Sequence, residues 1–247
     1  MTSNKNWLIV FAIGLLFSSL ALFSLHYIVF HDLHQIAFYT LQDLAFLPIE
    51  ALLVTLILHQ LLERQARKSK LNKLNMVIGL FFSEIGVPLM RFFSTRDLDF
   101  KQKNVFYLSL ETWSHSMYAS KKKEALKAPY KIQFFSNDLI SVRDMLIKKE
   151  DFLVRLLENP LLLEHESFTE VLLAVFHLTD ELKHRGSCAD LPESDMYHLS
   201  GDITRIYSRI IPVWLSYLEY LKADYPYLFS LAIRTNPFVG TEDSVVR

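Results

Sequence analysis

The feature that most constrains this 247-residue sequence is a run of 24 residues, from Trp7 to Phe30, without Asp, Glu, Lys or Arg. As an α-helix it measures about 36 Å, which is enough to cross a hydrocarbon core of roughly 30 Å. A cleaved signal peptide is the alternative, but the apolar stretch exceeds a signal core and no small-x-small cleavage site follows. We therefore expect a membrane-spanning helix over residues 7–30.

A second apolar stretch predicts a second span over residues 38–62, which closes a transmembrane hairpin over residues 1–62. The connection from His31 to Thr40 contains no Lys or Arg, whereas the segment after the second span is rich in both. Basic residues collect on the cytoplasmic side of membranes, where they also meet anionic lipid. We expect a multi-pass protein of the cytoplasmic (inner) membrane with both termini in the cytoplasm. The basic residues are Arg64, Arg67, Lys68, Lys70 and Lys73.

Residues 63–93 predict a basic, amphipathic juxtamembrane helix, which Pro88 should kink or end. Small and polar residues recur along it at helical spacing, at Asn72, Asn75, Gly79, Ser83 and Gly86. Three interpretations are open: packing against the rest of the cytoplasmic domain, pairing with a second copy, or lying in the membrane interface. In the first span, Gly14 and Ser18 form a similar small-xxx-small pair that permits close helix contact.

Residues 94–247 predict a cytoplasmic helical domain, which makes the whole chain all-α. We expect a helix near 105–127 that carries Phe106, and another after the cap candidates that begin at Ser136. A shorter helix precedes Pro160. Ser167 to Glu170 has the pattern of a capping box that opens a helix to about Arg185. A long helix follows over about 192–223 with Pro212 as a kink, then a short one near 227–234.

Composition excludes several classes of function. The only cysteine, Cys188, rules out an intramolecular disulfide and a multi-cysteine metal site. No Gly-rich phosphate loop is present, so we expect no nucleotide or other cofactor. The net charge of −1 gives no electrostatic basis for binding nucleic acid.

Glu50 is the one acidic residue expected near the middle of a span, where a carboxylate is costly. Ser18 and Ser19 are expected at similar depth in the first span and would supply hydroxyl groups. The nearby Pro48 would free a backbone carbonyl. A structural hydrogen bond between helices is one interpretation; an ion or proton path, which would require an oligomer, is the other.

Three carboxylate–histidine pairs have i,i+4 spacing, which is typical of residues on one helix face. They are Glu111/His115, His177/Glu181 and His198/Asp202. A metal site inside a bundle needs ligands that point inward, and helical geometry turns these pairs away from the apolar stripes. We therefore expect no metal site, with His177, Glu181, His198 and Asp202 as the candidates if one exists.

Four strings resemble an uncharacterised family of bacterial two-span membrane proteins. They are LAFLPIEALLVTLI (44–57), KLNMVIGLFFSEIG (73–86), FHLTDEL (176–182) and YPYLFSLAIRTNPF (225–238). The resemblance implies a bacterial cytoplasmic membrane, and it transfers no catalytic residue.

The sequence favours a membrane-anchored interaction or signalling module over an enzyme, because no nucleophile–base pattern is recognisable. The expected partners are the lipid bilayer and either a second copy, forming a homo-oligomer, or another protein. The aromatic segment at 225–229 is one candidate docking surface. An oligomeric channel or transporter subunit that uses Glu50, or a His/carboxylate metalloprotein, are the alternatives.

Overall fold

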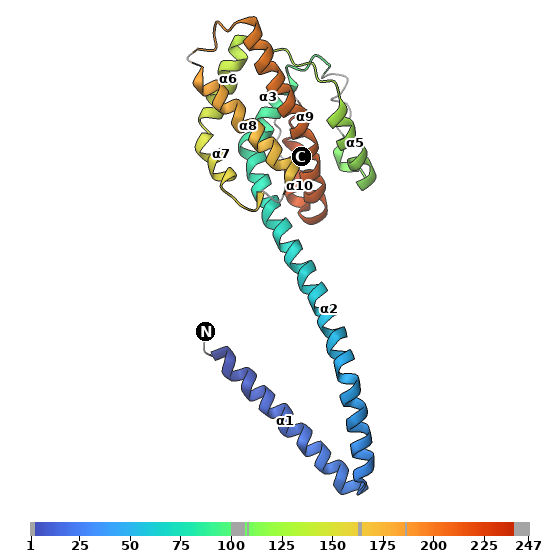
Figure 1. Cartoon of the computed structure of the whole chain (residues 1–247). Coiled ribbons are helices and arrows are strands. Elements are labelled where there is room, and N and C mark those ends of the chain that lie inside the picture. Colours follow the sequence, from blue (N-terminus) through green and yellow to red (C-terminus); the bar gives the residue numbers. More distant parts are fainter. Residues whose placement is uncertain (1–2, 100–106, 108, 163–164, 186, 240–247) are drawn as a thin grey trace. The chain divides into compact units, whose positions relative to one another are not determined.

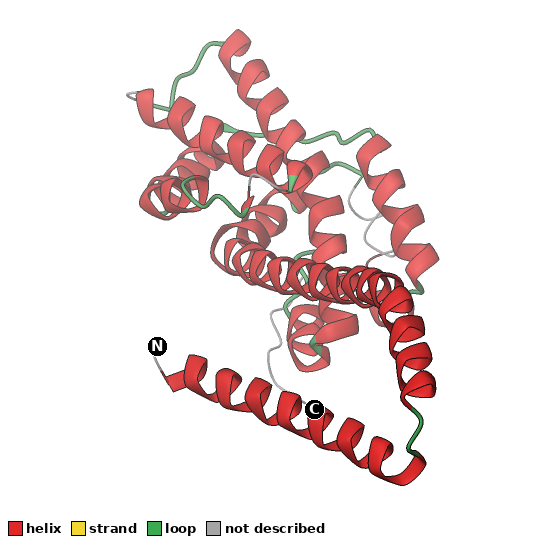
Figure 2. Cartoon of the chain, turned by 60° about the horizontal axis from the view of Figure 1, so that its bottom comes forward, coloured by secondary structure: helices red, strands yellow, loops and turns green. Residues whose placement is uncertain are grey.

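A computed structural model of the chain describes residues 3–99, 107, 109–162, 165–185 and 187–239. It divides into two compact units, Met1–Arg67 and Lys68–Arg247. The described residues form helices, and the β pairing found among them is an isolated bridge between Asp97 and Ile132 (Figure 2). The all-α prediction therefore holds for the described part of the chain.

The first unit consists of α1 (Ser3–Phe30) and the beginning of α2 (Leu33–Phe81), joined by a two-residue turn (Figure 1). His31 takes a left-handed conformation with φ of 50°. The Asp32 Oδ1 atom accepts hydrogen bonds from the amides of His34 (2.9 Å) and Gln35 (3.1 Å), which caps α2. The predicted connection over 31–40 is therefore too long, because the cap starts the helix at Leu33.

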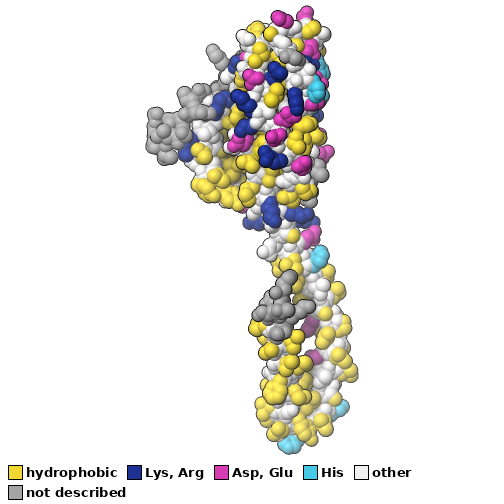
Figure 3. Space-filling view, turned by 90° about the vertical axis from the view of Figure 1, so that its left-hand side faces the viewer, with side chains coloured by type: hydrophobic (Ala, Val, Ile, Leu, Met, Phe, Trp, Pro, Cys, Tyr) yellow, Lys and Arg dark blue, Asp and Glu magenta, His cyan; other side chains and the backbone are white. Residues whose placement is uncertain are grey.

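Two helices are long and apolar enough, by length and composition alone, to cross a membrane: Ile9–Phe30 and the helical stretch Leu33–Ser94. The most apolar window of each has no buried residue. Figure 3 shows hydrophobic side chains over much of the visible surface of the first unit, while charged side chains mark the second. These helices are candidate spans.

The second unit begins with the end of α2 and continues through a π-helical turn, η1 (Phe82–Gly86), into α3 (Val87–Ser94). A 3-10 turn, η2 (Leu110–Thr112), precedes α5. The remaining helices are α5 (His115–Lys127), α6 (Ser136–Ile147), α7 (Glu150–Leu157), α8 (Glu166–His184), α9 (Glu193–Asp224) and α10 (Pro226–Arg234).

The core of this unit is organised around α9, which contacts α3, α5, α8 and α10 (Figure 1). Helices α6 and α7 pack against α8. Along α9 the buried residues recur at helical spacing and include Leu199, Ile203, Ile206, Ile210 and Trp214. These residues form one apolar stripe along the long helix that the sequence predicted, and α9 continues through Pro212.

Pro88 is accommodated by the π-helical turn that comes just before it. The amide of Val87 bonds to the carbonyl of Phe82, five residues earlier, and Pro88 then lies in the first turn of α3. A proline has no N–H and its ring collides with the preceding turn of an α-helix. The extra residue in the π-turn relieves this conflict. The helix therefore continues past Pro88 with one i→i−5 turn, where a kink or an end was expected.

Two predicted helix starts are wrong. The helix expected at 105–127 begins at His115, because Ser114 Oγ accepts the Met117 amide as an N-cap (3.3 Å). Phe106 lies outside the described residues. In α8 the cap is His165, whose Nδ1 accepts the Phe168 amide (3.2 Å), so Ser167 falls inside the first turn. An imidazole has here taken the place that the capping-box pattern gave to a serine.

Within the aromatic segment 225–229, Phe229 is buried, whereas Tyr227 and Leu228 are exposed; the residues that follow α10 pack into the core. Phe238 is buried, stacks on Tyr107 and meets Trp214 edge to face. The buried Asn236 donates from Nδ2 to the Tyr107 carbonyl (2.8 Å) and accepts the Phe238 amide at Oδ1 (3.0 Å). Tyr227 alone of these rings is strongly exposed.

We predict that Gly79→Ala destabilises the second unit. A Cβ atom at Gly79 would collide with the Tyr217 hydroxyl, and the Tyr217 ring is held by stacking on Phe82. We expect a loss of about 1–3 kcal/mol in unfolding free energy, measured by denaturant titration of the detergent-solubilised chain.

Gly201→Ala is the matched control, because a Cβ there meets nothing within 4 Å among the described residues. It should be neutral or stabilising by up to about 1 kcal/mol. Equal stabilities for the two variants would show that α2 does not pack on Tyr217 as described.

Candidate functional site

Helices α8 and α9 each carry one histidine followed four residues later by a carboxylate. The pairs are His177 and Glu181 on α8, and His198 and Asp202 on α9. Residues four apart lie on the same helix face. Because α8 and α9 pack side by side (Figure 1), each histidine comes within 4.0 Å of the carboxylate on the neighbouring helix, and we call this place the α8–α9 groove.

The four side chains form a closed ring in which nitrogen and oxygen donors alternate. The His177 Nε2 atom lies 3.7 Å from Asp202 Oδ2 and 4.0 Å from Glu181 Oε1. The His198 Nε2 atom lies 3.4 Å from Asp202 Oδ2 and 3.8 Å from Glu181 Oε2. Every histidine therefore faces both carboxylates, one from its own helix and one from its neighbour.

Asp202 is the buried member of this ring. Its side chain is 4% exposed, whereas the side chains of His177 and His198 are 51% and 53% exposed. Asp202 Oδ1 forms an ion pair with Arg205 Nη1 (3.0 Å). The other oxygen, Oδ2, is buried and has no hydrogen-bond partner in the described part of the chain. A buried carboxylate oxygen is costly unless something binds it, so Oδ2 requires a proton donor or a cation from the groove.

Glu181 connects the ring to a second ion-pair network. Arg185 Nη1 donates to Glu181 Oε2 (2.6 Å), and its Nε and Nη2 atoms donate to the two oxygens of Asp195 (2.8 and 2.6 Å). The hydrogen bond from Arg185 is the main cause that lowers the pKa of Glu181; the charges of His177 and His198 also contribute. The same arginine lowers the pKa of Asp195. Arg185 therefore ties the end of α8 to the start of α9.

The outward orientation predicted for these four residues is wrong for Asp202. The histidines do lie outside the apolar core, but the flank of α8 faces the flank of α9, so both pairs point into a shared groove. The sequence argument used only the angle between each pair and the apolar stripe of its own helix. That angle carries no information about where the neighbouring helix lies. As the side chains stand, no group of three or more His, Cys, Asp or Glu residues within the described ranges has the arrangement of a metal site.

The other predicted pair, Glu111 and His115, does not share a helix. Glu111 lies in η2 and His115 begins α5, where its Nδ1 contacts Glu219 of α9. Lys122 also reaches Glu219 (2.9 Å). This group is an ion-pair contact between α5 and α9.

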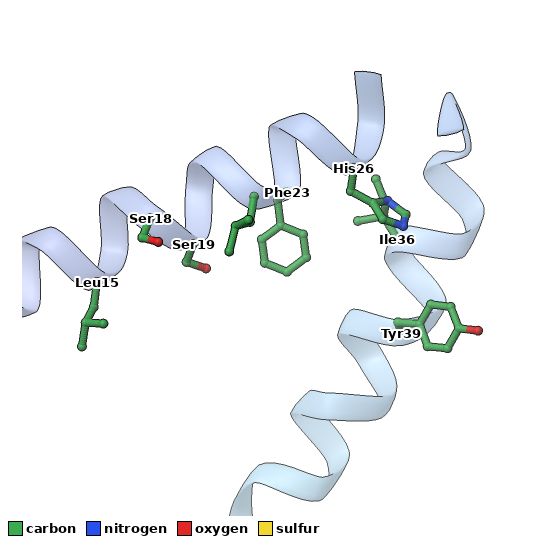
Figure 4. A pocket seen from close by; sticks show the side chains of 8 residues that line it. Leu15, Ser18, Ser19, Phe23, His26, Ile36 and Tyr39 are labelled. Atoms are coloured by element: carbon green, nitrogen blue, oxygen red, sulfur yellow. The ribbon is translucent and has the colours of Figure 1, made fainter. Parts of the chain in front are cut away.

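Ser18 and Ser19 line a pocket between α1 and α2 in the first unit, shown in Figure 4. The pocket has a volume of about 510 Å³, and its other labelled residues are Leu15, Phe23, His26, Ile36 and Tyr39. Ile36 and Tyr39 belong to the first two turns of α2. The pocket is largely apolar, and Glu50 does not line it.

Glu50 lies further along its helix from the turn than Ser18 does. Ser18 lies 13 residues before His31, whereas Glu50 lies 18 residues after Asp32. At 1.5 Å per residue the difference in helix length is about 7.5 Å. The residue of α1 at the same number of residues from the turn as Glu50 is Ile13, beside Gly14. A Cβ added at Gly14 would meet no other described atom within 4 Å, so α2 does not pack on this small-residue position.

The small and polar stripe after the basic segment packs on α9 within the second unit. Tyr220 donates to Asn72 Oδ1 (3.3 Å), and Gly79 lies against Tyr217. Gly86 lies against Phe81 and Phe82, and Ser83 lines an apolar cavity of about 410 Å³ between α3, α9 and α10. The basic residues Arg64, Arg67, Lys68, Lys70 and Lys73 are exposed on α2. Of the three interpretations, packing within the domain describes this arrangement.

Comparison with known proteins places both parts of the chain in one group. A model of the N-terminal helical domain of MJ1433 matches residues 3–62, and a model of the C-terminal helical domain of the uncharacterized protein MJ1433 matches residues 70–234. The chain belongs to the MJ1433 family. The uncharacterized protein MJ1433 of Methanocaldococcus jannaschii is 43% identical over 237 residues, which cover 96% of this chain and 95% of that protein. No solved structure matches the chain.

Membership of the MJ1433 family agrees with the expectation of an uncharacterised family, and the two domain models name helical domains without stating a membrane location. The relative named here is archaeal, so it does not establish the bacterial setting that the resemblance implied. The two MJ1433 domain models meet between residues 62 and 70, and the structural units divide between Arg67 and Lys68. Within the predicted third segment, 63–93, α2 runs to Phe81, and apolar residues from Leu74 onward are buried in the core of the second unit.

We predict that Asp195→Asn weakens the α8–α9 connection in a pH-dependent way. The lowered pKa of Asp195 means that its ion pair with Arg185 stabilises the fold at neutral pH, and that this stabilisation is lost as pH falls through the lowered pKa. We expect a loss of about 1–2 kcal/mol at pH 7 and convergence of wild type and variant in acid.

Denaturant titrations between pH 7 and about pH 3 measure this difference. Asp190→Asn, an exposed residue of the same connection, is the control and should follow the wild type. A constant gap between Asp195→Asn and wild type across the pH range would exclude the ion pair as its cause.

Proposed function

We propose that this chain is a membrane-anchored interaction module: an N-terminal helical hairpin holds a helical domain at the cytoplasmic face of the membrane, and the domain binds a protein partner. One observation carries the proposal. Successive residues of α1 are apolar and exposed around the whole helix, for example Leu16 at 72% and Phe17 at 74%. A helix that is apolar on every side belongs in a protein core or a membrane, and α1 lies in no core.

The orientation follows from charge. The turn between α1 and α2 carries no Lys or Arg, while Arg64, Arg67 and Lys68 follow the second apolar stretch. By the positive-inside rule this places the second unit and both termini in the cytoplasm.

The interaction role is supported by an open groove on the second unit. It has a volume of about 920 Å³ and lies between the N-terminal part of α9 and the chain that leads into α6. Its lining includes Leu98, Tyr130, Ile132, Phe134, Met196 and Tyr197. Exposed aromatic and aliphatic side chains in a groove are typical of surfaces that anchor a protein partner.

An ion path through Glu50 receives less support. That alternative needs polar groups close together on the two helices, and along the hairpin Glu50 is offset by about 7.5 Å of helix from Ser18 and about 9 Å from Ser19. We therefore assign the hairpin an anchoring role.

We predict that the protein resists extraction from membranes by alkaline carbonate and is released by detergent, because about 20 apolar residues in each span must leave lipid. A fluorescent reporter fused at the C-terminus should be active, and an alkaline phosphatase fused there should be inactive. Release by carbonate would contradict the membrane anchor. An active phosphatase would contradict its orientation.

We predict that Tyr197→Ala abolishes recovery of a stoichiometric partner in affinity purification from native membranes. Tyr197 is 84% exposed in the groove, and an aromatic anchor of this kind commonly contributes 2 kcal/mol or more, that is about 30-fold in affinity. Tyr227→Ala is the matched control: Tyr227 is 70% exposed, on α10 and outside the groove. Equal recovery with both variants would exclude the groove as the docking surface.

A further inference from the structure

We propose that His177, Glu181, His198 and Asp202 bind a divalent transition-metal ion in the groove between α8 and α9, with zinc as the best match. This inference is independent of the membrane anchor. It rests on the ring of donors and on the buried Asp202 oxygen, both of which belong to the second unit.

The donor set has the chemistry of such a site. Two imidazole nitrogens with two carboxylates suit zinc and its first-row neighbours, whereas calcium and magnesium prefer oxygen ligands alone. Both histidines offer Nε2 to the groove. With the proton on Nδ1, each Nε2 has a free electron pair for a metal.

The spacing of the donors is close to that around a bound ion. Ligands at about 2.0–2.2 Å from a tetrahedral zinc lie roughly 3.3–3.6 Å from one another. The two histidines lie 3.4 and 3.7 Å from Asp202 Oδ2, and 3.8 and 4.0 Å from the two oxygens of Glu181. Within the described ranges these side chains are not arranged as a metal site. The half-exposed imidazoles must therefore turn inward to bind an ion.

Asp202 supplies the observation that points to a ligand. Its Oδ2 atom is buried, lies 3.7 and 3.4 Å from the Nε2 atoms of His177 and His198, and has no hydrogen-bond partner among the described residues. The other oxygen is held by Arg205 (3.0 Å), which fixes the carboxylate as outer partners commonly do for metal ligands. The free oxygen thus remains available to an ion that enters past the exposed histidines.

Two arginines beside the ring oppose a cation. Arg205 pairs with Asp202, and Arg185 pairs with both Glu181 and Asp195. The carboxylates of Glu181, Asp195 and Asp202 outnumber these two arginines, so the groove retains negative charge. Because Arg185 competes for Glu181, the two histidines and Asp202 are the ligands on which binding depends most.

The test uses the full-length chain, purified in mild detergent and stripped with a chelator, with zinc chloride as the probe. Competition with a chromophoric chelator, followed by elemental analysis, should show one zinc per chain. His177→Gln and His198→Gln should each weaken zinc binding at least about tenfold. Both histidine side chains are about half exposed, so we expect the variants to fold, and circular dichroism checks this.

His184→Gln is the matched control. His184 also lies on α8 and faces a carboxylate four residues away, Asp180 at 3.3 Å, but it does not take part in the ring. Cys188→Ala is the second control, because the proposed site contains no thiolate. Both variants should bind zinc as the wild type does, and zinc should raise the melting temperature of both but not of His198→Gln.

Several results would overturn the proposal. These are the absence of stoichiometric zinc in the wild type, binding that survives in the His177→Gln/His198→Gln double variant, or binding lost in Cys188→Ala. A wild-type melting temperature that does not respond to zinc, although both histidine variants lower it, would identify the ring as a structural ion-pair network instead.

Discussion

The packing of residues 74–93 against α9 is the contact on which the second unit depends. Leu74, Ile78 and Phe81 are buried at helical spacing on the end of α2. The π-helical turn then adds one residue to the helical path, so Phe82, like Phe81 before it, is buried. Phe81 meets Phe168 of α8, and Phe82 stacks on Tyr217 of α9. Two successive aromatic rings thereby contact two different helices where α2 passes into the π-helical turn.

The same helix has to satisfy two different environments. Its first part exposes apolar side chains on every face, and its last part buries a narrow apolar stripe and turns polar and small residues toward α9. The exposed basic residues separate the two parts, and the two family models also change there. The physical boundary between anchor and domain is therefore a change in what surrounds the helix, since the backbone remains helical across it.

Long, strongly patterned elements could be predicted from the sequence, and short contacts could not. The helix expected over 192–223 is α9, Glu193–Asp224, because its apolar stripe extends over several turns. The starts of α5 and α8 were missed because a single capping side chain, Ser114 or His165, decides each one. The two-residue turn at His31–Asp32 was missed for the same reason, since Asp32 caps α2 and closes the hairpin early.

The meeting of the two His/carboxylate pairs could not be predicted from the sequence, for a different reason. His177, Glu181, His198 and Asp202 were recognised as two pairs, but their meeting depends on how α8 lies beside α9, which neither helix encodes alone. A useful signal would have been the repetition itself: the same His-x-x-x-carboxylate spacing on two helices joined by a short connection places equivalent side chains near one another when the helices pack antiparallel.

Glu181 then links the chemistry of the groove to the closure of the α8–α9 connection. Its carboxylate faces both histidines and also accepts a hydrogen bond from Arg185, which holds Asp195 at the start of α9. A cation drawn into the ring would compete with Arg185 for this one carboxylate. By linkage, whatever strengthens one of these contacts must weaken the other by the same free energy. Binding of a cation in the α8–α9 groove and the strength of the Arg185–Glu181 hydrogen bond would therefore be coupled through Glu181.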